Sequence, residues 1–120
     1  MKIGTDIVEI ERIKKLIDKY DTKFLNKIFT REEQQYCEQG LNRYQRYAGR
    51  FAAKEAIRKA LQPYSDEQYL PFRQIHILPD VAGVPIPRIT TDIEFTRQYG
   101  EISLSISHER HYAIACVIIN

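Results

Sequence analysis

The sequence contains no tryptophan, one methionine and only two cysteines among its 120 residues. Cys37 and Cys116 are far apart and form no CxxC pair, so neither a zinc site nor a disulfide framework is indicated. Reduced thiols of this kind are typical of the cytoplasm. No apolar run is long enough to span a membrane, and the N-terminus lacks the apolar core of a signal peptide. These absences favour a cytoplasmic protein that works without a membrane.

The residues that are present form an ordinary globular composition. Hydrophobic residues make up 43% of the sequence and charged residues 28%, a balance that excludes a disordered chain. The sequence contains no internal repeat, low-complexity tract or linker. A length of 120 residues therefore predicts one domain over 1–120, with a single modest core.

The net charge of +2 is distributed unevenly along the chain. Between Arg12 and Arg31 there are seven cationic side chains and two acidic ones, so this basic segment carries +5 and the remainder −3. Such polarity suits an acidic partner or a ligand rich in phosphate. A solvated helix face has the same pattern, and charge alone does not separate the two interpretations.

Hydrophobic periodicity predicts an α+β fold. The expected elements, in chain order, are a strand over 2–10, a helix over 10–20, a short helix with a capping box of Thr30 and Glu33, a long helix over 42–62, a strand over 72–78, a helix over 91–99, and a hairpin of strands 101–108 and 111–119. The segment 79–87, rich in glycine and proline, is interpreted as a turn. This order predicts a largely antiparallel sheet packed against a long central helix.

Glu55 is conspicuous in the long predicted helix because its neighbours in "RFAAKEAIRKAL" are small and apolar. Its helical stripe is too apolar for an ordinary solvated face, which predicts a partly buried position. A carboxylate in such a position must be paired or bound to a metal. An ion pair with Lys59, four residues later, would stabilise an exposed helix by about 0.2–0.5 kcal/mol and explains Glu55 equally well.

Asp6 is a second carboxylate in apolar surroundings. Its strand is apolar on both faces, so the side chain is expected to be half-buried, and Gly4 allows another backbone to approach closely. Carboxylates from two separate elements suit Mg²⁺, although a lone aspartate in a strand is more often a structural hydrogen-bonding group. Asp6 and Glu55 form a metal site only if both reach one point.

His108 ends a predicted strand in register with Ile102, Leu104 and Ile106, so the alternation predicts an inward-facing side chain. A histidine in this position is usually a core residue. At the mouth of a hairpin it can instead bind phosphate or transfer a proton.

Four segments carry a resemblance to a known family: "GTDIVEI" at 4–10, "FLNKIFTREE" at 24–33, "RYAGRFAAKEAIRKAL" at 46–61 and "SISHERHYAIA" at 105–115. Together they resemble the bacterial holo-[acyl-carrier-protein] synthases, the small trimeric class of 4′-phosphopantetheinyl transferases. The resemblance spans nearly the whole chain. It implies the phosphopantetheinyl transferase fold and a homotrimer with active sites between protomers.

The resemblance also implies a reaction in fatty acid biosynthesis. The 4′-phosphopantetheine arm of coenzyme A moves to a serine of apo acyl carrier protein, with Mg²⁺, and adenosine 3′,5′-bisphosphate leaves. By position, Asp6 and Glu55 are the implied metal ligands, and Lys59 stabilises or protonates the leaving group. The serine proton goes to Glu55 or to a metal-bound water, and the sequence leaves both possibilities open.

Other positions match the family's coenzyme A contacts. Arg50, Lys54 and Lys59 fall where the family places cations around the nucleotide phosphates. His108 falls where the family contacts the 3′-phosphate end, and it would come from the neighbour of the chain that supplies Asp6 and Glu55. Gly83 and Pro85 preserve a turn near coenzyme A.

The resemblance also implies a binding partner for the basic segment, because acyl carrier proteins are acidic. Arg12 matches the family's carrier-binding arginine, and Phe24 matches an apolar contact position. The cations Lys15, Lys19 and Lys23 lie on the same predicted helix or just after it. Charges of this kind mainly set the encounter rate and its dependence on salt.

Two departures from the family pattern lie in loops around coenzyme A. The segment 63–71 lacks a glycine-rich turn, and Val84 stands where a lysine is common. A catalytically weak trimeric scaffold that binds carrier protein or nucleotide is therefore one alternative. A basic nucleic-acid-binding module is another, but the sequence contains no RRM, KH or helix-turn-helix signature.

Overall fold

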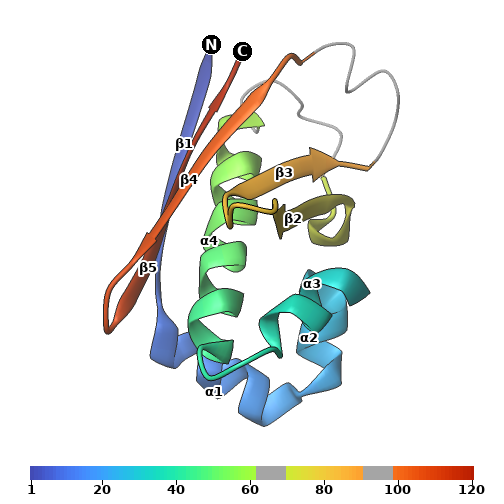
Figure 1. Cartoon of the computed structure of the whole chain (residues 1–120), viewed down its shortest axis with the longest axis vertical. Helices are drawn as coiled ribbons and strands as arrows, with labels where there is room; N and C mark the ends of the chain where they lie inside the picture. Colours follow the sequence, from blue (N-terminus) through green and yellow to red (C-terminus); the bar gives the residue numbers. More distant parts are fainter. Residues whose placement is uncertain (62–69, 91–98) are drawn as a thin grey trace.

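A computed structural model of the chain describes residues 1–61, 70–90 and 99–120. The long helix α4 runs through the middle of the molecule, between a three-stranded sheet on one side and the smaller elements on the other (Figure 1). Among the described residues, no helix is long and apolar enough to cross a membrane.

The elements follow one another along the chain in the following order: β1 (Lys2–Glu9), α1 (Ile10–Tyr20), α2 (Thr22–Ile28), α3 (Arg31–Cys37), α4 (Arg43–Leu61), a 3₁₀ turn (Phe72–Gln74), β2 (Ile75–Pro79), β3 (Pro85–Ile89), β4 (Ile102–His108) and β5 (Tyr112–Ile119). The first sheet has the strand order β1-β5-β4, and β2 pairs with β3 in a second sheet. Every pairing is antiparallel, which confirms the predicted sheet type and the α+β class.

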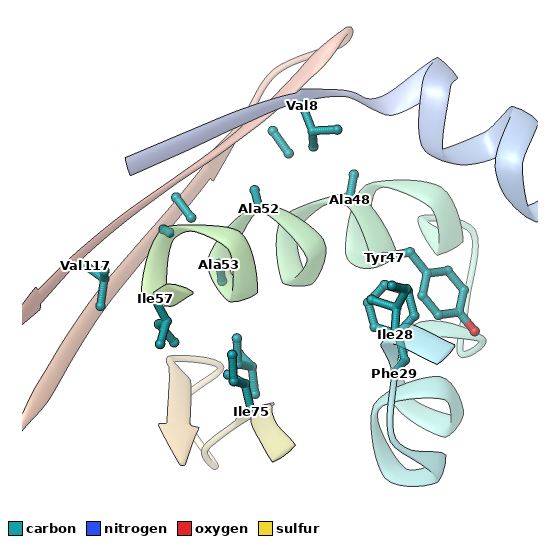
Figure 2. Packing of buried hydrophobic residues seen from close by; sticks show 14 of the residues in the cluster. Val8, Ile28, Phe29, Tyr47, Ala48, Ala52, Ala53, Ile57, Ile75 and Val117 are labelled. Atoms are coloured by element: carbon teal, nitrogen blue, oxygen red, sulfur yellow. The ribbon is translucent and has the colours of Figure 1, made fainter. Parts of the chain in front are cut away.

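Helix α4 packs closely because its buried residues are small. Ala52, Ala53 and Ala56 are fully buried, and their short side chains let a strand lie directly against the helix. Figure 2 shows Ala48 and Ala52 on the side of α4 where Val8 of β1 lies, whereas Ile57 is on the side of Ile75. The helix is therefore buried on two sides, as its sequence predicts.

Gly4 makes the contact between β1 and α4 possible. A Cβ atom at this position would lie 2.0 Å from the carbonyl oxygen of Ala56, far inside van der Waals contact. Only a residue without a side chain allows the strand backbone to meet the helix backbone at this point. Asp6 lies two residues further along β1, on the same face, so this contact fixes its approach to α4.

Several local predictions are confirmed. Helix α4 begins at Arg43, directly after the expected cap Asn42. The capping box is present, because the Thr30 side chain accepts a hydrogen bond from the Glu33 amide and the Glu33 side chain accepts one from the Thr30 amide. The hairpin of β4 and β5 is present, but its turn lies at Arg110 and His111 rather than at Glu109 and Arg110, because Glu109 bonds to Tyr112 across the hairpin.

Other predictions need correction. The segment 79–87 is more than a turn, because β3 begins at Pro85 and pairs with β2. The strand predicted over 72–78 starts at Ile75, after a 3₁₀ turn. The face of β1 that carries Ile3 and Ile7 is exposed, at 69% and 61%, so in one chain β1 is covered on one side only. The helix expected over 91–99 and the end of α4 beyond residue 61 lie outside the described residues.

Candidate active site

Asp6 and Lys59 form an ion pair between β1 and α4. Lys59 Nζ lies 2.8 Å from Asp6 Oδ1 and donates a second hydrogen bond, of 3.3 Å, to the carbonyl oxygen of Thr5. The Asp6 side chain is 14% exposed, as expected for a half-buried group, whereas that of Lys59 is 51% exposed. A fixed carboxylate is thus paired with a mobile, solvent-facing cation.

Glu55 lies one helical turn before Lys59 on the same side of α4. Its side chain is 29% exposed, which confirms the predicted half-buried position. The predicted alternative, an ion pair between Glu55 and Lys59, is replaced by the pair of Lys59 with Asp6. Glu55 makes a contact of 3.5 Å with Arg58, at the limit for a hydrogen bond.

The chemistry of these donors fits a hard divalent cation. The Asp6 and Glu55 carboxylates are half-buried oxygen donors from two elements, and the Lys59 ammonium already stands as a cation beside one of them. Within the described part of the chain, no group of three or more His, Cys, Asp and Glu side chains is placed to hold a metal. Water or substrate oxygens would therefore have to complete the coordination shell.

Lys54 does not face this site, and its prediction as a phosphate-binding cation is wrong for this structure. The side chain is fully buried, and its ammonium donates to Glu33 Oε1 at 2.6 Å, to the Ile28 carbonyl at 2.7 Å and to the Phe72 carbonyl at 3.1 Å. These bonds use all three of its N–H donors. Desolvation lowers the pKa of Lys54, and the negative charge of Glu33 opposes that shift.

Glu33 explains why Lys54 is buried. Besides Lys54, the Glu33 carboxylate accepts hydrogen bonds from the amide of Thr30 and, at 2.8 Å, from the amide of Ile77 in β2. One buried carboxylate thus connects α3, α4 and the small sheet. The sequence identifies Glu33 as a capping residue, but it gives no sign of this second role.

Arg50 and His108 meet in a second cluster, beside β4. They line a cavity of about 150 Å³ together with Arg46 and Tyr36. Arg50 is only 7% exposed, and its Nε atom is buried without a hydrogen-bond partner in the described structure. Its guanidinium lies 4.4 Å from the Tyr36 ring centre, as does that of Arg46. A buried cationic donor without an acceptor suits an anionic ligand.

This cluster revises the sequence interpretation in two ways. His108 is the last residue of β4 and is exposed, so the predicted inward-facing side chain is wrong. Arg46 and Tyr36 were not predicted as site residues. The spacing of Arg46 and Arg50 places both cations on one side of the helix, which is the signal that could have identified Arg46.

The two clusters lie on different sides of α4. At 100° per residue, Glu55 and Arg50 point about 140° apart around the helix. Asp6 of β1 and Ile106 of β4 are both paired with Ala115 of the intervening strand, so their backbones are about 10 Å apart. One chain therefore carries an acidic half-site, defined by Asp6, Glu55 and Lys59, and a basic half-site, defined by Arg46, Arg50 and His108.

The predicted carrier-binding residues lie on exposed surface. Arg12, Lys15 and Lys19 line an open groove of about 360 Å³ along α1, together with Leu16 and Tyr20. Lys23 is exposed in α2, and the half-buried Phe24 packs edge-on against Phe29. Gly83, with φ of 86°, lies in the turn between β2 and β3, and Pro85 is the first residue of β3, so the predicted turn is present but ends before Pro85.

Comparison with known proteins gives consistent matches. The sequence model of the 4′-phosphopantetheinyl transferase superfamily matches residues 2–117. A holo-[acyl-carrier-protein] synthase of Halothermothrix orenii is 44% identical over 97% of this chain and 94% of its own length. The Helicobacter pylori holo-[acyl-carrier-protein] synthase in complex with coenzyme A superposes with a TM-score of 0.85, at 34% identity over 98% of this chain and 99% of that one. A Bacillus anthracis synthase in complex with coenzyme A (3′,5′-ADP) gives 0.78, at 35% identity over 98% and 94%.

Proposed function

The chain belongs to the 4′-phosphopantetheinyl transferase superfamily, and we propose that it is a holo-[acyl-carrier-protein] synthase. It transfers the 4′-phosphopantetheine arm of coenzyme A to a serine hydroxyl of apo acyl carrier protein and releases adenosine 3′,5′-bisphosphate. This step prepares the carrier protein for fatty acid biosynthesis in the cytoplasm. The observation that carries the proposal is the acidic half-site, where the Asp6–Lys59 pair joins β1 to α4 and the half-buried Glu55 lies one helical turn before Lys59.

The acidic half-site carries the chemistry. Asp6 and Glu55 would hold Mg²⁺, which when bound would supply positive charge to the pyrophosphate oxygens. Lys59 has donor capacity beyond its bonds to Asp6 and Thr5, so it can stabilise the leaving bisphosphate. Among the described residues, Glu55 has one long contact, with Arg58, so it is the better placed of the two carboxylates to accept the serine proton.

The basic half-site binds the nucleotide end of coenzyme A. The unpaired Nε atom of Arg50 offers a buried donor to a phosphate oxygen, and His108 lies on the same cavity. Arg46 adds a second positive charge on the same side. A phosphate there satisfies a donor that otherwise remains buried without an acceptor.

The separation of the half-sites supports a homotrimer in which neighbouring chains complete each site. Each chain supplies Asp6 and Glu55 to one neighbour and Arg50 and His108 to the other. The outer face of the three-stranded sheet has the character of a protein interface, because large apolar side chains remain exposed on it. They are Ile3, Ile7, Tyr112, Ile114 and Ile118.

The groove on α1 is the docking surface for the acidic carrier protein. Arg12, Lys15 and Lys19 line it together with the apolar Leu16, and they outnumber the two carboxylates in its lining, those of Glu9 and Glu11. Cations at the rim of an interface accelerate encounter with an acidic partner and make binding sensitive to salt.

The test is incubation with coenzyme A, Mg²⁺ and an apo carrier protein, followed by intact-mass measurement. The carrier gains the mass of one phosphopantetheine arm with the wild-type protein and not with Glu55→Gln. Glu32→Gln is the matched control, because Glu32 is an exposed glutamate of α3 outside both half-sites. No mass gain with several carriers, despite retained carrier binding, would favour the scaffold alternative.

Mixed trimers test whether the half-sites come from different chains. Asp6→Asn inactivates one half-site and His108→Ala the other, so each variant alone forms no intact site. Random co-assembly of equal amounts places an intact acidic half-site against an intact basic one in about a quarter of the interfaces. We expect transferase activity near that fraction of the wild-type value. No recovery after co-assembly would mean that each site lies within one chain.

A further inference from the structure

We propose that Lys59 occupies the cation position of the metal site while the metal is absent. Divalent-ion binding then displaces the Lys59 ammonium from Asp6 and makes it available to the phosphates of coenzyme A. This inference rests on the proposed function, because it takes Asp6 to be a metal ligand.

The first support is the set of atoms that Lys59 contacts. Its ammonium is held by one carboxylate oxygen of Asp6, at 2.8 Å, and by the main-chain carbonyl oxygen of Thr5, at 3.3 Å. Carboxylate and carbonyl oxygens are also the donors that hard divalent cations take. The ammonium and a metal ion therefore compete for the same carboxylate group of Asp6.

The second support is the difference in freedom between the two partners. Asp6 is part of β1, where the contact of Gly4 with the carbonyl of Ala56 sets its position. Lys59 extends a flexible four-carbon chain from the helix surface, and its side chain is 51% exposed. Lys59 can therefore leave without any change in the sheet or the helix.

The third support is the contrast with Lys54 on the same helix. The Lys54 ammonium is enclosed by three acceptors and fully buried, so it has neither a place to move to nor a donor to offer. Lys59 uses two of its three donors and faces solvent. Of these two lysines, only Lys59 can exchange one hydrogen-bond partner for another.

Two consequences follow for binding. The ion pair weakens metal binding, because the free energy needed to displace Lys59 from Asp6 reduces the net binding free energy of the metal. A bound phosphate offers Lys59 another partner, so coenzyme A strengthens metal binding, and by reciprocity the metal strengthens coenzyme A binding. Lys59 thereby couples the two ligands in addition to its part in the reaction.

Direct metal titration tests the competition without any turnover. Binding of Mn²⁺ alone is followed by electron paramagnetic resonance for wild type, Lys59→Met, Arg58→Met and Asp6→Asn. Because a half-exposed ion pair is worth little, we expect Lys59→Met to bind Mn²⁺ about twofold to fivefold more tightly than wild type. Arg58→Met is the charge-matched control, since it removes a cation that contacts Glu55 at 3.5 Å while leaving the oxygen of Asp6 occupied.

The possible outcomes distinguish a failure of this inference from a failure of the proposed function. Equal gains in Lys59→Met and Arg58→Met would mean that removing any cation near the two carboxylates has the same effect, and would overturn a specific displacement of Lys59. If Lys59→Met does not bind more tightly while Asp6→Asn loses binding, the metal site stands and only this inference fails. If Asp6→Asn binds Mn²⁺ as well as wild type, the metal assignment in the proposed function fails, and this inference fails with it.

Nitrogen-15 NMR of the lysine ammonium groups gives a second readout, with Mg²⁺ alone as the probe. The Lys59 signal should shift in proportion to Mg²⁺ occupancy. The Lys54 signal should not change, because its three acceptors stay in place, and it serves as the control within the same sample. A Lys59 signal that is unchanged at saturation would overturn the proposal.

Discussion

Lys54 and Lys59 lie on the same helix and each is paired with a carboxylate, but their surroundings differ. The Glu33–Lys54 pair has no exposed side-chain surface and connects α3, α4 and β2 through a network of hydrogen bonds. The Asp6–Lys59 pair joins one strand to one helix, and the lysine is half exposed. The first pair organises the fold, while the second leaves a cation exposed to solvent, where the proposed function requires one. Both residues are lysines, so their roles are distinguished by how deeply each side chain is buried and by how many of its N–H donors are already hydrogen-bonded.

Breaking the buried pair has the largest expected effect. Lys54→Met leaves the Glu33 carboxylate buried without its cation, which should lower the free energy of unfolding by about 3–5 kcal/mol in urea denaturation. The double variant Glu33→Leu with Lys54→Met removes both charges and should recover much of that loss. A single-variant loss below about 1 kcal/mol would place this pair in the same class as Asp6–Lys59.

Gly4→Ala tests the backbone contact that positions Asp6. The new Cβ would overlap the carbonyl oxygen of Ala56, which is backbone and cannot rotate away. We expect a loss of about 1–3 kcal/mol in the free energy of unfolding, together with weaker Mn²⁺ binding. Gly49→Ala is the control, because its Cβ would meet a side-chain methyl of Ile106 at 3.1 Å. An equal or larger loss in Gly49→Ala would contradict the special role of Gly4.

The pH dependence of stability tests how well the buried region excludes water. Burial raises the pKa of the Cys37 thiol from 9.0 to about 12. Below pH 9 the thiol is protonated in both states; above it, the unfolded chain loses a proton that the folded chain keeps. The free energy of unfolding should therefore fall with rising pH, by up to about 1.4 kcal/mol per pH unit from this group. Cys37→Ala should flatten the decline measured in urea between pH 9 and 11, whereas Cys116→Ala, at an exposed position, should not.

Lys59→Met should have the smallest effect on stability and a large effect on activity. Because the pair with Asp6 is half exposed, its loss should change the free energy of unfolding by less than about 1 kcal/mol. Transferase activity, measured by the mass gain of the carrier, should fall severely, since the leaving bisphosphate loses its cation. A stability loss comparable to that of Lys54→Met would remove the distinction between the two pairs.

The sequence predicted the half-buried positions of Asp6 and Glu55 because both follow from local periodicity. Strand alternation placed Asp6 on the face of Val8, and the helical stripe placed Glu55 beside small residues. The capping box of α3 was equally visible, since its two residues are three positions apart. Relations within one element, at fixed spacing, can be recognised without a structure.

The sequence did not separate the roles of Lys54 and Lys59. The partner of Lys54 is Glu33, which lies in another helix and stands in no periodic relation to it. The partner of Lys59 lies 53 residues away in β1. Strand β3 was missed because Pro85 and Pro87 read as turn residues, although an edge strand tolerates proline. Such features depend on how separate elements pack against one another, and hydrophobic periodicity along the sequence does not reveal that packing.

The two half-sites lie on different sides of α4, so under the proposed pairing of neighbouring chains the number of complete sites depends on how the chains assemble. Joined head to tail, two chains complete one site and leave one unmatched half at each end of the pair. In the proposed homotrimer, a third chain would close the ring and leave no half unmatched, so three chains would yield three complete sites. Dilution that opens the ring would therefore remove catalytic capacity from correctly folded chains.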